Sequence, residues 1–277
     1  MPLSPLTVGI LGLGQIGGSM ASRLSAHDAP PTLLGFDLRT ELCTAARDRA
    51  IVSDVARSET ELIESSEVVI LALPVRDIVS LLRRQHALLR SKAAVTDTGS
   101  VKTEIMRVAS DLSLDNFVGG HPLAGAEKSG IASWNHALFN GAPYFITPLS
   151  GQDTGAITIL NDIVIRLGAK PVPVDPQHHD FIFSVTSGLP HLFAFCLRRQ
   201  YLNIPESAVD KELFRCPSFR SATRVADSDP ETVFQMLWLN RASLSENLGV
   251  LLNCLAGAQR ALDAGDERGF RRFFKNS

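Results

Sequence analysis

Cysteine is scarce in this chain, and the net charge is close to zero. Four cysteines occur among 277 residues, and no two of them form a CxxC pair. Such spacing favours reduced thiols over a disulfide framework or a zinc site, so we expect a cytoplasmic protein without a metal. The 27 basic and 29 acidic residues are mixed along the chain. This mixture is unlike the basic footprint of a nucleic-acid binder, so we expect a small-molecule substrate and no nucleic-acid partner.

The sequence also lacks the signals of secretion and membrane insertion. Its amino end carries no basic region followed by an apolar segment, which argues against a secretory leader. We further expect no uncharged run that approaches the roughly 18 residues of a membrane span. These absences predict a protein without a membrane partner, and the length of 277 residues is enough for two medium domains.

The most informative feature that is present is the opening VGILGLGQIGGSM. Gly12, Gly14 and Gly17 stand in GxGxxG register directly after an apolar run. At a turn from strand to helix, the first glycine allows the bend, the second lets the backbone approach a pyrophosphate, and the third lets the helix pack on the strand. Gln15 and Ile16 belong to the same turn, whose N–H groups would face the phosphates. We therefore predict a dinucleotide site.

A second apolar run supports this prediction because it ends in Asp37, twenty residues beyond Gly17. A carboxylate there can accept from the ribose hydroxyls of the adenosine and would repel a 2′-phosphate, which favours NAD. Arg39 follows two residues later and could meet such a phosphate, so NADP stays an alternative.

Short β-rich runs alternate with helical stretches up to Val174, which is typical of a doubly wound α/β sheet of the Rossmann type. The run VVILALP is apolar on both faces, as expected for a central parallel strand. Leu73 and Pro74 end it where a cofactor would cross the sheet, so their loop should contact the cofactor. The expected strands are Val8–Leu11, Leu33–Phe36, Val68–Leu73, Ala93–Thr96, Phe117–Gly119, Tyr144–Thr147 and Lys170–Val174.

Strand signals stop after Val174, so we expect a dinucleotide-binding domain over residues 1–174 and an all-helical domain over residues 175–277. One helix of the second domain should run from Phe181 to Arg199. Gly188 and Pro190 should kink it, because a proline inside a helix removes a hydrogen bond and clashes with the preceding turn.

A second long helix should begin at Asp229–Glu231, where an N-cap residue, a proline and an acid follow one another. Apolar residues then recur at alternating spacings of four and three. Such a stripe must be buried, and a small domain has little core, so we expect a homodimer through these helices; packing within the chain is the alternative. The seam consists of Leu237, Arg241, Leu244, Leu248, Leu251, Leu255, Ala258 and Leu262.

Two polar, glycine-rich segments follow predicted strands, TDTGSVK and GGHPLAGAEKSG. The carboxyl ends of parallel strands form one crevice, so their side chains can converge there. His121 is the candidate general base, because a neutral imidazole can take the proton of a substrate hydroxyl as hydride leaves the adjoining carbon. Ser100 could hold that hydroxyl, or it could cap the following helix. Thr98, Lys102, Glu127 and Lys128 lie in the same two segments.

The second domain supplies cationic and imidazole groups that a substrate with carboxylates would require. His178, His179, His191, Arg220 and Arg224 are candidates. An arginine can fork onto a carboxylate, whereas a surface ion pair is the alternative for Arg224.

Eight short motifs are spread over nearly the whole chain. They are GLGQIGGS, ILALPV, DTGSVK, GGHPLAGAEKSG, LFNGAPYFITP, LGAKPVPVDPQHHD, TSGLPH and FRSATRVADSDP. Their combination resembles the prephenate and arogenate dehydrogenase family of tyrosine biosynthesis. The resemblance implies oxidative decarboxylation of a cyclohexadienol: hydride passes from the ring carbinol carbon to the nicotinamide, CO2 departs, and the ring becomes a phenol.

The resemblance also assigns roles by position. It implies that His121 is the base and that Ser100 lies beside the ring hydroxyl. Arg224 would bind a substrate carboxylate, and His191 would lie near the substrate's side chain. Glu127 and His179 fall on further family positions and are expected near the substrate, together with Lys128 and Arg220.

Four positions depart from the family pattern: Ala126, Gly188, Ser221 and Val233 stand where threonine, histidine, aspartate and tryptophan are usual. The substrate is therefore left open among prephenate, arogenate and a specialised analogue such as 4-amino-4-deoxyprephenate. Two other classes are weighed. A β-hydroxyacid dehydrogenase would need a lysine between residues 181 and 202, where none occurs. A non-catalytic NAD-binding sensor should lack the base and the anion clamp, and the candidates for both are present.

Overall fold

The computed structural model describes residues 6–125, 130–149, 154–205 and 210–275. The chain forms two compact units, Met1–His179 and Asp180–Ser277. The helix Pro176–Phe183 (α7) contributes its first residues to the first unit and its last residues to the second.

The first unit is built on an eight-stranded sheet with the order β3-β2-β1-β4-β5-β6-β7-β8. Every neighbouring pair is parallel except β6 with β7, which is antiparallel. β4 lies inside the sheet, and all of its residues are buried. The predicted Rossmann-type fold is therefore confirmed. The strands are β1 (Thr7–Leu11), β2 (Thr32–Phe36), β3 (Asp54–Val55), β4 (Val68–Leu71), β5 (Ala94–Asp97), β6 (Phe117–Pro122), β7 (Pro143–Thr147) and β8 (Lys170–Pro173).

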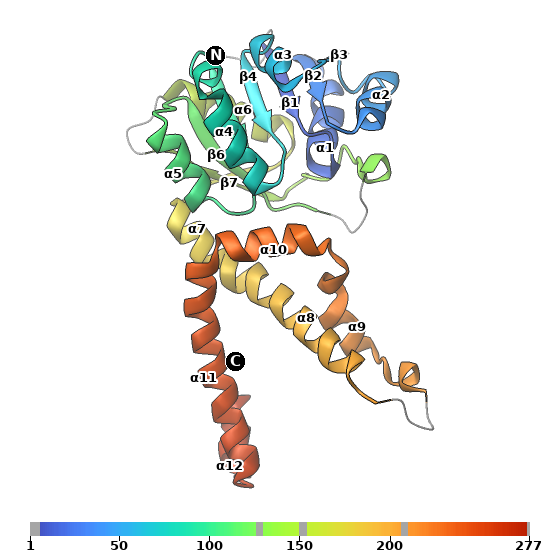
Figure 1. Cartoon of the computed structure of the whole chain (residues 1–277), viewed down its shortest axis with the longest axis vertical. Helices are drawn as coiled ribbons and strands as arrows, with labels where there is room; N and C mark the ends of the chain where they lie inside the picture. The colour runs from blue at the N-terminus through green and yellow to red at the C-terminus, as the bar shows by residue number, and fades with distance from the viewer. Residues whose placement is uncertain (1–5, 126–129, 150–153, 206–209, 276–277) are drawn as a thin grey trace. The chain divides into compact units, whose positions relative to one another are not determined.

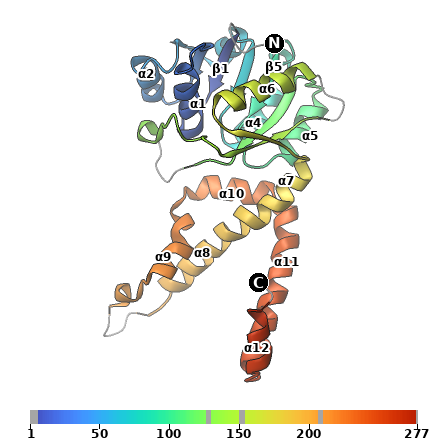
Figure 2. The same cartoon turned by 180° about the vertical axis from the view of Figure 1, so that it is seen from behind.

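Helices cover both faces of this sheet. Figure 1 shows α4 and α5 in front of the strands, and Figure 2 shows α1 and α6 on the opposite face. The apolar sides of α1 and α6 meet the strands in a core that includes Leu13, Met20 and Leu160. On the other face, α4 buries Ile78 and α5 buries Ile105. The helices of this unit are α1 (Gln15–Ser25), α2 (Thr40–Asp48), α3 (Glu59–Glu64), α4 (Val75–Leu89), α5 (Thr103–Asp111), the 3₁₀ turn η1 (Gly130–Ser133) and α6 (Thr154–Arg166).

Most strand bounds lie within one or two residues of their predictions, and β3 and β6 differ more. The two-residue strand β3 was missed because it is too short to show an alternating pattern. β6 runs to Pro122, three residues beyond the predicted end, because it pairs with β7 along that length. His121 therefore lies within a strand, opposite Phe145, and the prediction that placed it in a loop was wrong.

The second unit is all helical, as predicted. A π-helical segment separates α7 from α8 near the predicted kink: the N–H of Leu189 bonds to the Ser184 carbonyl, five residues back. Pro190 at the start of α8 has no N–H to donate, which favours such an irregular turn. The elements after α7 are η2 (Ser184–Gly188), α8 (Leu189–Leu202), η3 (Lys211–Phe214), α9 (Pro217–Thr223), η4 (Arg224–Asp227), α10 (Pro230–Leu239), α11 (Arg241–Asp263) and α12 (Glu267–Phe273).

The second predicted long helix is instead two helices. α10 ends at Leu239, and the next residue, Asn240, breaks the helix before α11 begins, with a φ of −102° and a ψ of 21°. Asp229 caps α10 as expected, because its side chain accepts from the N–H of Thr232. α11 has 23 residues and buries none of them within the described chain.

One expectation about apolar runs was wrong. No Asp, Glu, Lys or Arg occurs from Phe181 to Leu197, and the helical stretch Pro176–Leu202 contains an 18-residue window with a mean hydropathy of 1.4, which makes it long and apolar enough to cross a membrane. Length and composition alone do not distinguish a membrane span from a packed helix. α8 packs on α9, η4 and α11 within its unit, and 33% of the apolar window is buried in the described structure.

Candidate active site

The candidate site lies where β1, β4 and β5 end side by side. Leu11 pairs with Leu71, and Leu71 pairs with Asp97, so the residues that follow them share one edge of the sheet. The N–H of Thr98 donates to the Leu71 carbonyl at 3.1 Å, so the pairing of β4 with β5 continues into the loop that follows β5. The predicted cofactor residues Leu73 and Pro74 follow β4 at this edge.

The glycine-rich turn has the geometry that its sequence demands. Gly12 has a φ of +92°, and a Cβ on it would lie 2.2 Å from the Ala72 carbonyl oxygen. A Cβ on Gly17 would lie 1.9 Å from the Gly12 carbonyl oxygen. Gly14 is the N-cap of α1, and the first N–H groups of a helix make no bonds within it. These residues fit a pyrophosphate, because only glycine leaves this close backbone approach open.

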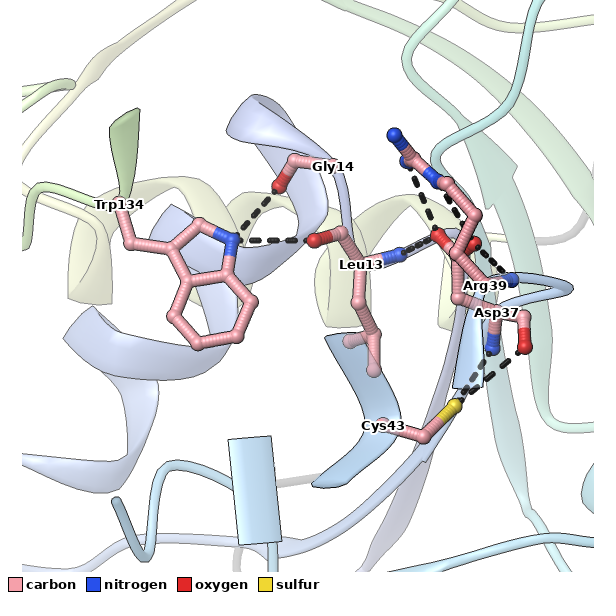
Figure 3. Close-up of polar contacts among 6 residues, drawn as sticks. All are labelled: Leu13, Gly14, Asp37, Arg39, Cys43 and Trp134. Atoms are coloured by element: carbon pink, nitrogen blue, oxygen red, sulfur yellow. Dashed lines mark hydrogen bonds and ion pairs between the residues drawn. The ribbon is translucent and has the colours of Figure 1, made fainter. Parts of the chain in front are cut away.

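Asp37 stands beside this turn and binds it directly (Figure 3). Its Oδ2 accepts the N–H of Leu13 at 2.8 Å, while its Oδ1 accepts from the backbone N–H of Arg39 at 2.9 Å and from Arg39 Nε at 3.2 Å. The thiol of Cys43 contacts the backbone of Asp37 from behind, and burial raises the pKa of this thiol. The carboxylate is thus fixed where a ribose would lie, and Arg39 is paired with it.

A buried ion pair organises the loop after β5. Asp97 and Lys102 are both fully buried and form a salt bridge. Asp97 also accepts the N–H of Gly99 at 2.8 Å and the N–H of Gly120 at 3.1 Å, and Lys102 donates to the Gly120 carbonyl at 2.6 Å. The pair therefore fixes both sides of Gly120, the residue before His121. Sequence reasoning missed Asp97, although an acid at the end of a buried strand, followed by glycine and lysine, was the available signal.

His121 is buried beside a second histidine. Its Nδ1 lies 2.9 Å from Nε2 of His179, and the two rings meet edge to face with centroids 5.1 Å apart. Burial, with smaller contributions from His179 and Lys102, holds the pKa of His121 well below its usual value. The imidazole is therefore neutral at pH 7, as a general base must be.

The structure gives the surroundings of two further candidates. His179, which was expected to bind substrate, is 4% exposed, and its Nε2 faces His121. Ser100 was weighed as a helix cap, but the N-cap of α5 is Lys102, because the chain turns into the helix two residues later. Ser100 is half-buried in the loop held by the ion pair.

Other predicted residues lie in several places. Gln15 reaches toward the segment that follows His121, because a Cβ on Gly125 would lie 3.7 Å from its Oε1. Glu127 and Lys128 lie outside the residues that the structure describes, as does Ala126.

No group of three or more His, Cys, Asp or Glu side chains that could hold a metal ion occurs in the described ranges.

The remaining candidates belong to the second unit. His191 is half-buried, and its Nδ1 donates to the Ser187 carbonyl at 2.8 Å. Arg224 is exposed at the end of α9, and Arg220 donates from Nε to the Arg215 carbonyl at 2.8 Å. His178 is exposed within α7.

A glycine turn at a helix N-terminus, a fixed carboxylate for a ribose, and a neutral buried histidine define a dinucleotide-dependent dehydrogenase with an appended helical domain. Residues 20–172 match the family described as prephenate dehydrogenase, nucleotide-binding domain, and residues 175–276 match prephenate dehydrogenase, dimerization domain. The chain belongs to the prephenate dehydrogenase family and is an NAD-dependent oxidoreductase.

Characterised relatives span the chain. The prephenate dehydrogenase of Bacillus subtilis (strain 168) is 29% identical over 98% of this chain and 74% of its own length. The cyclohexadienyl dehydrogenase of Zymomonas mobilis is 28% identical over 98% of this chain and 93% of its own. The structure of Aquifex aeolicus prephenate dehydrogenase with hydroxyphenyl propionate and NAD+ is 27% identical, with a TM-score of 0.90 over 98% of this chain and 96% of its own.

Proposed function

We propose that this chain oxidises and decarboxylates prephenate or arogenate with NAD, as a step of tyrosine biosynthesis. The observation that carries the proposal is the neutral, buried His121 at the edge of the sheet that also holds the glycine turn. The relatives named as prephenate, cyclohexadienyl and arogenate dehydrogenases support it.

In this mechanism, His121 takes the proton of the ring hydroxyl. Nδ1 faces His179, so with Nδ1 protonated and donating to His179, Nε2 carries the lone pair that accepts the proton. We assign His179 the role of holding this tautomer, and Ser100 the role of hydrogen-bonding the same hydroxyl. NAD, when bound, supplies the acceptor for the hydride of the carbinol carbon.

Decarboxylation then needs little from the protein. The electron pair of the bond to the departing carboxylate moves through the ring to the oxygen, which regains its proton from His121. The products are CO2 and a phenol, and aromatisation makes the reaction effectively irreversible.

We assign the pyrophosphate to Gly12, Gly14, Gln15, Ile16 and Gly17, and the ribose to Asp37. Leu73, Pro74 and Thr98 would line the nicotinamide side, since they follow the strands at the same edge. The pairing of Arg39 with Asp37 favours NAD over NADP, because the guanidinium already has an anionic partner.

For the substrate carboxylates we propose Arg224 and Arg220 from the second unit and Lys128 after β6, and for the rest of the substrate we propose His191 and Glu127. Arginine suits this role because its planar fork matches a carboxylate. A substrate with two carboxylates would use more than one of these cations.

We also propose a homodimer through the C-terminal helices and a domain division after Val174. α11 leaves large apolar side chains exposed, including Val250 at 67% and Leu262 at 56%, which a partner could cover. All four cysteines are free, which supports the expected cytoplasmic location. Elution of the purified protein at the mass of one 30 kDa chain would contradict the dimer.

The test of the proposed activity is spectrophotometric. Purified protein is mixed with NAD and either prephenate or arogenate, and the absorbance of NADH is followed. NADH formation with either substrate supports the proposal and identifies the preferred substrate. No signal with either would overturn it.

A further inference from the structure

An indole ring lies against the glycine-rich turn and binds its carbonyl groups. Trp134 follows η1, in the connection between β6 and β7. Its Nε1–H points between two backbone oxygens of the turn, 3.0 Å from Leu13 O and 3.1 Å from Gly14 O (Figure 3).

These bonds complete the fixation of the turn. The N–H of Leu13 donates to Asp37, and its carbonyl accepts from Trp134, so both polar groups of this residue are held. The Gly14 carbonyl accepts from Trp134 and also from the N–H of Gly18 at 2.9 Å, which is the first bond of α1. Both carbonyls therefore point toward the indole.

A fourth glycine accommodates the ring. Gly18 lies next to the GxGxxG motif but outside its three glycines, and a Cβ on it would lie 2.0 Å from Trp134 Nε1 and 2.4 Å from Cδ1. Its backbone conformation does not require glycine, so the indole is the reason that a side chain is excluded. The same segment is bound again where the N–H of Asn135 donates to Ser19 Oγ at 3.0 Å. Arg49 lies over the indole ring, with its Cζ 5.4 Å from the ring centroid.

We propose that Trp134 is a positioning residue of the cofactor site. It holds the Leu13 and Gly14 carbonyls away from the pyrophosphate, so that the N–H groups at the start of α1 face the anion. Without the indole N–H, the peptide that follows Leu13 could rotate and present its oxygen to the phosphates, whereas the Gly14 carbonyl would keep its bond to the N–H of Gly18. This inference rests on the proposed use of the turn for NAD.

The experiment measures NADH binding directly, from the fluorescence of the bound cofactor and without substrate. Trp134→Phe keeps an aromatic ring and removes the donor, so the Kd for NADH should rise about 3- to 10-fold, the scale of a lost hydrogen bond. At saturating NAD, kcat should stay within about twofold of the wild-type value, because the loss is one of ground-state binding.

Trp238→Phe is the matched control, because the chain has two tryptophans and Trp238 is a half-exposed residue of α10 in the second unit. This variant should bind NADH within about twofold of the wild type. An unchanged Kd in Trp134→Phe would overturn this inference alone. Absence of NADH binding in the wild type would overturn the cofactor site and this inference together.

A second pair of variants separates a specific contact from general damage. Gly18→Ala should raise the Kd for NADH in the wild-type chain, since its methyl group would displace the indole. In a Trp134→Ala background, Gly18→Ala should leave the Kd unchanged and raise Tm, because alanine is the better helix former. Equal effects of Gly18→Ala in both backgrounds would refute the assignment.

Discussion

Replacing Lys102 by methionine should be the most damaging single change in the first unit. Methionine keeps much of the side-chain shape but removes the cation, which leaves the Asp97 carboxylate buried with the N–H groups of Gly99 and Gly120 in place of a counter-charge. Breaking a fully buried ion pair in this way costs about 3–5 kcal/mol. At roughly 2–4 °C per kcal/mol for a unit of this size, Tm should fall by about 6–20 °C.

The same change should move the pH dependence of catalysis. Lys102 helps to hold the pKa of His121 low. Without this cation the imidazole is protonated at a higher pH, so the acid limb of kcat/KM should shift upward.

Urea unfolding in a Trp238→Phe background measures the first effect, because Trp134 is then the fluorescent reporter and lies in the first unit. The double variant Asp97→Asn, Lys102→Met is the control, since it removes both charges and should recover most of the lost stability. A cost below about 1 kcal/mol for Lys102→Met, or a double variant no more stable than the single one, would refute the role of the pair.

The remaining predictions concern the base and the substrate clamp. His121→Asn should lower kcat by about two to four orders of magnitude while the Kd for NADH stays the same, and unchanged turnover would remove His121 from its role. The folded state depresses the pKa of His121. As the pH falls below about 6.5, the imidazole of His121 therefore binds a proton in the unfolded chain but stays neutral in the folded chain. The stability contributed by the neutral imidazole is therefore complete above that pH and lost below it; urea titrations from pH 8 to 5 should show the decline, and His121→Asn should reduce it. Arg224→Ala should mainly raise the KM for prephenate or arogenate, and a fall in kcat alone would reassign the residue.

The parts of the fold that could be predicted from the sequence are those that depend on local chemistry. The backbone at Gly12 has a positive φ, and the space at Gly17 excludes a side chain. Both positions therefore require glycine, and the glycine-rich turn could be predicted from its residues alone. Apolar strands such as VVIL are equally direct, since burial on both faces leaves no polar position.

The features that were missed depend on partners distant in the sequence. His121 lies in a strand because β7 pairs with this segment, and the residues next to His121 in the sequence do not indicate that pairing. The leucine spacing on both sides of Asn240 fits one continuous helix as well as two helices. The spacing therefore could not predict the break between α10 and α11. Trp134 is 121 positions away from Leu13 in the sequence, and the additional glycine Gly18 beside the motif was the one local sign of this contact.

The double anchoring of Gly120 has a consequence for the energetics of the reaction. Its amide and its carbonyl are both tied to the buried charges of Asp97 and Lys102, so the backbone that carries the imidazole is immobilised when the sheet assembles. The orientation of His121, the proposed proton acceptor, is thus set during folding, before any ligand binds, and little reorganisation is left for the transition state.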